Sequence, residues 1–365
     1  MHCTSIHVKA YRALCAYLGI DPEPVRFLDV IQQVVVPKRE VLDRLGVDTR
    51  GLYPLCSHNW GVEGQDLGDC YEHTDEWGFT HRLPKPDGLW WCQVRSPLSG
   101  TCLSAEAIRE HRWPDAARPE RTRGLRTQAE QYRAQGKIVM LKGLCAGLFE
   151  MGLRIRGMEN FLCDLLTDPA PAGLLLDQLL DLKKQFWAMA LEELGDLVDI
   201  VVEVDDYGTQ GSQLIGYPTF QSLIAPRLRD LIGFLKDTLA RQKQPPERGY
   251  VFFHSCGNIR PFLPDFIDMG IDIINPVHIN AAEMGPARLK EDFGHAITFW
   301  GGSVDAQSIL PYESPRKVRD AVKTNLTALM PGGGYVFTSI HNIQAEVPPA
   351  NIMAMWEALQ EFGQY

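Results

Sequence analysis

The sequence predicts an α/β fold, a (β/α)8 TIM barrel with an N-terminal extension and a hairpin insertion. From about residue 138 onward, short apolar runs alternate with segments of helical periodicity, a pattern typical of βα units and a parallel sheet. No glycine-rich phosphate fingerprint follows an early strand, so a doubly wound nucleotide-binding sheet fits less well. With 365 residues the chain is long enough for a barrel with insertions. We therefore expect residues 1–365 to form a single barrel domain.

Residues 1–130 are expected to hold the N-terminal helices, the first strands and the insertion. An apolar run followed by a helical pattern spans 27–46. The segment 79–98 is typical of a β-hairpin that turns at the Pro-Asp-Gly sequence 86–88, because these residues favour tight turns between strands. We expect this hairpin to be an insertion into the barrel.

Residues 131–365 are expected to hold the clear βα units. The apolar runs are rich in Val, Ile and Phe, as strands buried on both faces should be, and they span 137–143, 199–206, 249–257, 271–278, 296–305 and 334–342. The predicted helices span 160–167, 172–193, 219–242, 260–269, 285–293, 315–329 and 348–363. In helix 315–329, Ser314 can cap the first turn and Pro315 suits the first helical position. Its apolar residues fall on one stripe, so this helix should lie against the sheet.

Composition and charge exclude several classes of function. The chain carries 46 acidic and 36 basic residues, a formal charge of -10, so we expect neither nucleic acid nor a membrane surface as a partner. No stretch reaches the roughly 18 apolar residues that a membrane span needs. The N-terminus lacks a secretory signal pattern, and the nine cysteines lack framework spacing, which indicates reduced thiols and a cytoplasmic location.

The strongest local signal is the sequence His254-Ser255-Cys256-Gly257 at the end of an apolar run. Side chains two residues apart in a strand share a face, so His254 and Cys256 should point the same way. In a βα barrel, such strand ends border the active site. His341, in the last predicted strand, is the best placed third ligand. One thiolate and two imidazoles suit a catalytic zinc ion with one open position. The alternative is a buried thiol beside a satisfied histidine.

Acidic residues end another predicted strand. Alternation places Glu203 and Asp205 on one face and Asp206 on the other, so we expect the first two to point into the barrel mouth. There they would complete the zinc shell or act as a general acid, and Asp305 is a third candidate catalytic carboxylate. A helix cap or a salt bridge is the alternative. Glu150 has a similar position with weaker support.

Further polar and aromatic residues are candidates for substrate contact. Polar groups at neighbouring strand ends are expected to orient ligands or bind substrate, and they are Asn275, His278, Gln307, Asn342 and Gln344. Tryptophans near the insertion offer a surface for an aromatic ring or pack in the core, and they are Trp60, Trp77, Trp90 and Trp91. The remaining histidines without a companion at metal spacing are taken as surface or packing residues: His58, His73, His81 and His111.

Several motifs together resemble the uroporphyrinogen decarboxylase superfamily. They lie in order over roughly residues 130–365, as DDYGTQ (205–210), HSCGNI (254–259), INPVH (274–278), FGHAITFWGGSVDAQSILPYESPRKVRDAV (293–322) and PGGGYVFTSIHNIQAEVPPANIMAMWEAL (331–359). The resemblance implies a (β/α)8 barrel with its site at the C-terminal ends of the strands.

Within the superfamily, the sequence is more similar to the zinc-dependent corrinoid and coenzyme M methyltransferases than to the tetrapyrrole decarboxylases. The decarboxylases carry an Arg-containing segment similar to MRQAGRY near the N-terminus, and this sequence has none. The methyltransferases bind zinc through an H-x-C pair and a later Cys; His254 and Cys256 match the pair, whereas His341 stands where that Cys is expected. Two His and one thiolate would leave zinc with a formal charge of +1, which favours polarising a methyl donor over activating a thiol.

These features predict a zinc-dependent methyltransferase of the O-demethylase type. It would move a methyl group from a small methylated, methoxylated substrate to a corrinoid (cobalamin) on a partner protein. A metal-free decarboxylase of the same fold, acting on a small carboxylic acid, is the alternative enzyme. A corrinoid-binding or regulatory protein that has lost catalysis is the alternative from another class.

Overall fold

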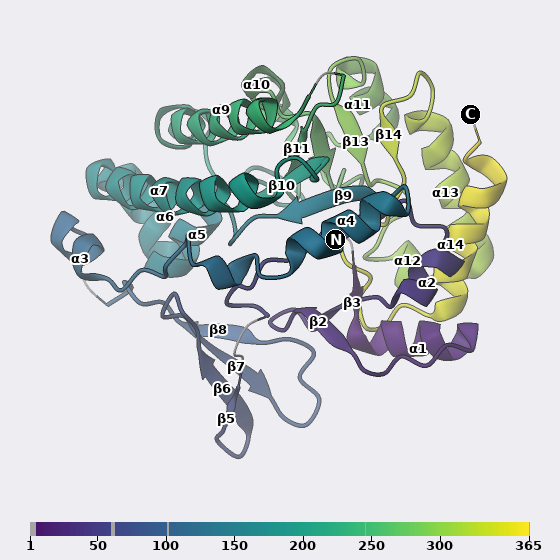
Figure 1. Cartoon of the computed structure of the whole chain (residues 1–365), viewed down its shortest axis with the longest axis horizontal. Coiled ribbons are helices and arrows are strands. Elements are labelled where there is room, and N and C mark those ends of the chain that lie inside the picture. The colour runs from purple at the N-terminus through teal and green to yellow at the C-terminus, as the bar shows by residue number, and fades with distance from the viewer. Residues whose placement is uncertain (1–4, 60–62, 101, 245, 365) are drawn as a thin grey trace.

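A curled parallel sheet forms the centre of the computed structural model, which describes residues 5–59, 63–100, 102–244 and 246–364 (Figure 1). Within these ranges the sheet has seven strands in the order β14-β13-β12-β11-β10-β9-β4. The strands are β4 (Thr49–Leu52), β9 (Ile138–Lys142), β10 (Ile200–Val204), β11 (Tyr250–His254), β12 (Ile273–Asn275), β13 (Thr298–Trp300) and β14 (Tyr335–Val336). This arrangement confirms the predicted TIM barrel class.

The pleat of the strands separates an inner layer from an outer one. Met140, Val202, Phe252 and Trp300 belong to a cluster inside the barrel, whereas Val201 and its equivalents on other strands pack into the core beneath the helices. Both faces of each strand are therefore buried, which explains the continuous apolar runs in the sequence. On each of four strands, the next inward position lies two residues beyond a member of this cluster, towards the C-terminal end of the strand. These positions are Lys142, Val204, His254 and Asn275.

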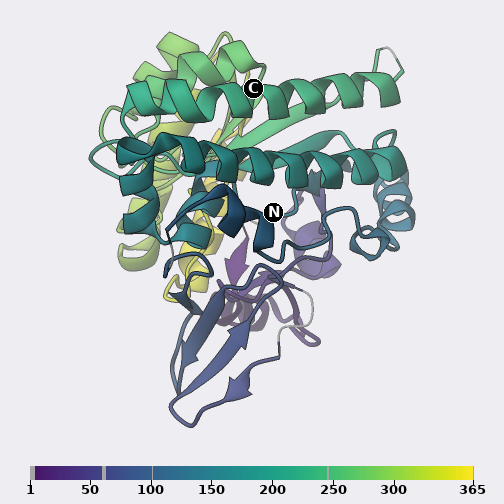
Figure 2. The same ribbon diagram turned by 90° about the vertical axis from the view of Figure 1, so that its left-hand side faces the viewer.

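Helices cover the outside of the sheet, as Figure 2 shows from the side. They are α4 (Leu125–Ala134), α5 (Leu148–Arg156), α6 (Met158–Thr167), α7 (Pro169–Leu194), α9 (Ala225–Gln242), α10 (Leu263–Met269), α11 (Pro286–Phe293), α13 (Pro315–Leu329) and α14 (Pro349–Phe362). Helix α13 has the predicted bounds, and the Ser314 hydroxyl accepts from the Lys317 N–H at 3.4 Å. Helix α5 was not predicted from the sequence. No helix in the described ranges combines the length and apolarity that crossing a membrane requires.

A small antiparallel sheet from the N-terminus fills the gap between the two edges of the barrel sheet. It contains β1 (Ile6–His7), β2 (Arg26–Asp29) and β3 (Val34–Val36), with β3 in the middle. On one side, the His7 N–H donates to the Ile343 carbonyl at 2.8 Å, just beyond β14. On the other side, the Val30 N–H donates to the His58 carbonyl at 2.8 Å, just beyond β4. Among the described residues, this sheet takes the place of an eighth parallel strand.

The remaining N-terminal elements flank this core. They are α1 (Val8–Leu18), α2 (Arg39–Arg44) and α3 (Ala105–Glu110), and α12 (Ile309–Tyr312) precedes α13 later in the chain. Helix α1 packs against α14, so elements from the two ends of the chain lie side by side (Figure 1).

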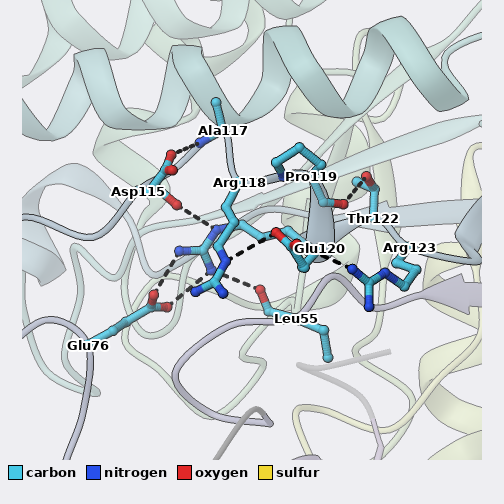
Figure 3. Close-up of polar contacts among 10 residues, drawn as sticks. Leu55, Glu76, Asp115, Ala117, Arg118, Pro119, Glu120, Thr122 and Arg123 are labelled. Carbon is cyan, nitrogen blue, oxygen red and sulfur yellow. Dashed lines mark hydrogen bonds and ion pairs between the residues drawn. The ribbon is translucent and has the colours of Figure 1, made fainter.

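The predicted hairpin is present and belongs to a larger insertion. Strands β7 (Thr80–Pro84) and β8 (Cys92–Arg95) pair antiparallel, and β5 (Gln65–Asp66) and β6 (Cys70–Thr74) extend the sheet to four strands. This sheet projects from the barrel in both views (Figures 1 and 2). Its base is held by the Arg121 guanidinium, which is buried and lies 2.7 Å from a Glu76 carboxylate oxygen. Figure 3 shows the surrounding acceptors, including the Leu55 and Asp115 carbonyls, both 2.9 Å from the guanidinium.

The later strands are shorter than predicted. The run 296–305 is predicted as one strand but ends at Trp300, and Gly301 and Gly302 follow with φ of 129° and 66°. The run 334–342 holds only Tyr335 and Val336 as strand. Because φ values in this range break the extended backbone, the residues after these strands form loops at the barrel mouth.

Candidate metal centre

Three side chains converge at the C-terminal edge of the barrel sheet. His254 is the last residue of β11, Cys256 follows two residues later, and His341 lies beyond β14. One ligand atom from each residue lies within 4.8 Å of the others. The sequence separation of His341 from the pair is bridged because β11 and β14 belong to the same curled sheet. The three residues predicted as metal ligands are thus brought together, and their role as ligands stays a prediction.

His254 is held in one orientation by the amide of Asn275 on the neighbouring strand. The Asn275 Nδ2 donates to the Trp300 carbonyl at 2.8 Å, so its Oδ1 faces the imidazole. This oxygen lies 2.5 Å from His254 Nδ1 and can only accept, so Nδ1 carries the proton. The other ring nitrogen, Nε2, is left with its lone pair 3.2 Å from Cys256 Sγ. An imidazole anchored through one nitrogen and open at the other has the geometry of a metal ligand.

Cys256 is positioned by the loops that follow β10 and β11. Its backbone N–H donates to Asp206 Oδ1 at 2.8 Å, and the same oxygen lies 3.8 Å from His254 Nε2. Gly257 follows with φ of 81°, and a Cβ there would lie 2.4 Å from the Gly208 backbone. Only glycine allows this turn, which keeps the thiol at the barrel mouth.

His341 has a left-handed backbone, with φ of 65°. This conformation is uncommon for a residue with a Cβ and is concentrated at functional sites. The turn directs its ring towards His254, and the two ring centroids are 5.4 Å apart. The Ser339 hydroxyl donates to the His341 carbonyl at 2.9 Å and supports the turn.

A cavity of about 60 Å³ opens beside these residues, room for about five water-sized groups. Its wall consists of Gln32, His58, Lys142, Cys145, Ala146, Glu150, Arg154, Val204, Asp206, His254 and His341. The sequence does not single out several of these residues as parts of a site, and it predicts His58 to be a surface or packing residue. Lys142 had a visible signal in the sequence, because it is a cation at the end of an otherwise apolar strand.

His58 is fixed in the wall by a carboxylate from the N-terminal sheet. The buried Asp29 Oδ2 lies 3.1 Å from His58 Nδ1 and also accepts from Gln32 Nε2 at 3.1 Å. Burial lowers the pKa of His58, despite the nearby carboxylate. His58 is therefore an oriented imidazole in the cavity wall, and burial favours its neutral form. The prediction that it is a surface or packing residue missed this position.

The prediction that Glu203 and Asp205 face the barrel mouth is wrong. Glu203 points outward to helix α7, where its carboxylate accepts from Lys183 Nζ at 2.6 Å and from Trp187 Nε1 at 2.5 Å. The predicted alternation is correct, but the phase is inverted. It is Asp206, with Val204, that reaches the cavity.

Asp205 caps the start of helix α5. Its carboxylate accepts from the backbone N–H groups of Phe149 and Glu150 at 2.9 and 2.8 Å and from the Tyr207 hydroxyl at 2.7 Å. Burial raises the pKa of Asp205 to about 7, although these hydrogen bonds act in the opposite direction. All of its contacts are internal, so the alternative of a helix cap fits Asp205 and that of a salt bridge fits Glu203. Glu150 does reach the cavity and pairs with Arg154 at 2.5 Å.

The other predicted polar residues surround the site without lining the described cavity. Asp305 accepts from the backbone N–H groups of Gln307 and Ser308 at 2.7 and 3.0 Å, which caps its own loop. Burial would raise the pKa of Asp305, but a hydrogen bond from the Ser308 hydroxyl together with these N–H groups outweighs it and holds the pKa below its usual value. His278, whose pKa is lowered by burial, accepts from the Gly257 N–H at 3.3 Å. Gln344 donates to the Asn342 carbonyl at 3.0 Å.

The residues that line the cavity, among those the structure describes, include none of the tryptophans near the insertion. Trp77 is buried in the main core and packs edge-on against Trp113, with ring centroids 6.4 Å apart. Trp91 is buried and Trp90 is 47% exposed. Trp60 lies outside the described residues. The packing alternative therefore fits Trp77 and Trp91.

The sequence pattern of the family described as uroporphyrinogen decarboxylase (URO-D) matches residues 101–362, which is most of the chain. The chain belongs to the uroporphyrinogen decarboxylase family. The matched range contains His254, Cys256 and His341, so the candidate site lies within the family's common barrel. Membership of this family and the barrel fold indicate that the protein is an enzyme of the superfamily.

Two further comparisons name proteins to which this member of the uroporphyrinogen decarboxylase family is similar. A uroporphyrinogen decarboxylase from Magnetococcus marinus is 26% identical over 195 residues, which cover 53% of this chain and about half, 49%, of the relative. The solved structure of a methyltransferase from Methanosarcina mazei superimposes with a TM-score of 0.54 at 15% identity, covering 99% of this chain and 100% of the other. At that identity the likeness shows a shared fold.

Proposed function

We propose that this protein is a zinc-dependent methyltransferase that moves a methyl group from a small methoxylated substrate to a corrinoid carried by a partner protein. The observation that carries the proposal is the convergence of His254, Cys256 and His341 within 4.8 Å beside a cavity at the C-terminal edge of the barrel. Active sites of βα barrels form at this edge.

The donor set fits zinc. Imidazole nitrogen and thiolate sulfur are the ligands that zinc prefers, and three protein ligands with one open position are typical of catalytic sites. Asn275 leaves His254 Nε2 available, and its hydrogen bond would fix the ring as a ligand. The Asp206 carboxylate, 3.8 Å from that nitrogen, is the best placed additional oxygen donor. It replaces Glu203 and Asp205, which point elsewhere.

The charge of this donor set favours an ether oxygen over a thiol as the group bound there. One thiolate and two neutral imidazoles leave a zinc ion with a formal charge of +1, and such an ion, when bound, supplies Lewis acid polarisation of the oxygen that loses its methyl group. The protein's own residues position that oxygen. His254 and His341 form part of the wall of the cavity in which that oxygen would lie.

Metal content tests the proposal. Protein purified without added metal or a histidine tag is analysed by elemental mass spectrometry as wild type, Cys256→Ala and Cys163→Ala. Cys163 is an exposed thiol on α6 and controls for the loss of any cysteine. We expect about one zinc per chain in wild type and Cys163→Ala and a large loss in Cys256→Ala. Equal zinc in all three would contradict the ligand assignment.

Activity separates the candidate functions. Zinc-loaded protein is incubated with small methoxylated compounds and free reduced cobalamin as a stand-in acceptor, and methylation is followed by absorbance. Turnover that is lost in Cys256→Ala supports the methyltransferase. Release of CO2 from a small acid by metal-free protein would instead favour the decarboxylase of the same fold, and cobalamin binding without turnover would favour the regulatory alternative.

A further inference from the structure

The cavity has a second pole that the metal proposal does not use. Lys142 is the last residue of β9, and its side chain lines the cavity while only 8% of the residue is exposed. It occupies an inward position two residues beyond Met140, which belongs to the apolar cluster inside the barrel. A lysine side chain that points into a barrel, above an apolar layer, is costly unless an anion meets it.

The ammonium group of Lys142 has no partner in the part of the chain that the structure describes. No hydrogen bond or ion pair involves it there. The other cation in the wall, Arg154, is paired with Glu150 at 2.5 Å. Of the other two buried lysines in the described ranges, Lys183 is paired with Glu203 at 2.6 Å, and Lys243 donates to the Asp196 carbonyl at 3.2 Å and lies 3.7 Å from the Asp199 carboxylate. Lys142 thus differs from its neighbours by lacking the counter-ion that buried cations need.

The charges around the cavity leave a position for one anion when the metal is present. Lys142 and Arg154 contribute two positive charges, and Glu150 and Asp206 two negative ones. A zinc ion with the Cys256 thiolate adds one net positive charge. The residues that line the cavity would then carry a surplus of +1. The buried Asp29 carboxylate lies behind His58, outside this lining, and Lys142 has no paired carboxylate among the described residues.

Strand register sets the distance between the two poles. Lys142 pairs with Val202 on β10, and Val204, two residues further, pairs with His254 on β11. The α-carbons of Lys142 and His254 are therefore two strands apart and offset by two residues, a separation on the order of 10 Å. A molecule with an anionic group at one end and a methoxy group a few bonds away fits between these side chains.

We propose that Lys142 binds a carboxylate of the substrate, so that the methyl donor is a small methoxylated carboxylic acid. Its carboxylate lies at the Lys142 end and its ether oxygen at the end formed by His254, Cys256 and His341. This inference rests on the proposed function for the identity of the reacting group. Recognition of the carboxylate by Lys142 can be measured without it.

Calorimetric titration of zinc-loaded protein in chloride-free buffer tests the inference. Methoxyacetate is the probe, and methoxyacetamide is its uncharged counterpart. We expect methoxyacetate to bind wild type at least tenfold more tightly than it binds Lys142→Met, and methoxyacetamide to bind both proteins equally weakly. Lys184→Met, which alters a lysine on the outer helix α7, is the matched control and should bind methoxyacetate as wild type does.

Three results would overturn the inference. They are the absence of methoxyacetate binding to wild type, equal binding by Lys142→Met, and displacement of methoxyacetate by an equimolar amount of chloride, which would indicate a site for any small anion. Urea denaturation of Lys142→Met separates recognition from a structural role, since a lysine without a partner leaves stability unchanged or raised when it is replaced. Zinc content measured on the same preparations separates a failure of metal binding from a failure of carboxylate recognition, and Lys142→Met should keep the zinc content of wild type.

Discussion

The Nδ1 atom of His254 lies 2.5 Å from Oδ1 of Asn275, two side chains on adjacent parallel strands. Because the same amide donates to the Trp300 carbonyl, the orientation of the amide is set by the backbone of a third strand. Three neighbouring strands therefore fix which nitrogen of His254 faces Cys256. The sheet itself preorganises this part of the site.

Replacing Asn275 with Leu should weaken zinc binding about 10- to 100-fold, because His254 loses the group that orients it. Zinc affinity is measured by competition with a chromogenic chelator. Asn325→Leu is the matched control, since Asn325 is a buried amide that donates to the Ser303 carbonyl at 3.0 Å without contacting the three candidate ligands. Equal zinc affinity in both variants would remove Asn275 from the support of the site.

Replacing His341 with Gly or Ala should lower zinc affinity at least tenfold in both cases, because a ligand is lost. The two metal-free variants should differ in stability. At φ of 65° alanine retains the left-handed strain that glycine avoids, so the Gly variant should be more stable by about 1 kcal/mol in urea denaturation. Unchanged zinc affinity in either variant would exclude His341 as a ligand.

Replacing Glu203 with Gln should reduce the free energy of unfolding by about 3 kcal/mol, because it leaves the buried Lys183 ammonium without its counter-ion. The double variant Lys183→Met with Glu203→Leu should recover most of this loss. Zinc content should stay that of wild type in both. A stable Glu203→Gln protein with reduced zinc would instead restore Glu203 to the metal site.

His81 should make the protein sensitive to mild acid. Burial lowers the pKa of His81 to about 4, and the unfolded chain has the ordinary value of 6.5. The unfolded state therefore binds the proton first, and stability falls as the pH decreases from 6.5 towards 4. Between pH 7 and pH 4.5, His81→Phe should lose about 2 kcal/mol less than wild type in urea denaturation. Parallel losses in the two proteins would show that His81 does not titrate in this way.

The sequence predicts the barrel and the grouping of the three candidate ligands because both depend on strong local patterns. Apolar runs mark buried strands, and His254 and Cys256 occur two residues apart at a strand end. The same pattern cannot give the phase of β10. Both faces of a parallel strand are apolar, so alternation alone does not distinguish Glu203 outside from Asp206 inside. His58 was missed for another reason, since its orientation depends on Asp29 from a separate sheet.

The small N-terminal sheet links the two ends of the chain at the site. Ile343 exchanges backbone hydrogen bonds with Ser5 and His7, two residues after His341. During synthesis on the ribosome, His254 and Cys256 emerge long before His341. The N-terminal segment around Ser5 and His7 can form its hydrogen bonds with Ile343 only after that residue has been synthesised. Two donors alone hold zinc more weakly than three. In the proposed zinc site, metal uptake would therefore follow the synthesis of His341, which makes zinc loading a late step in maturation.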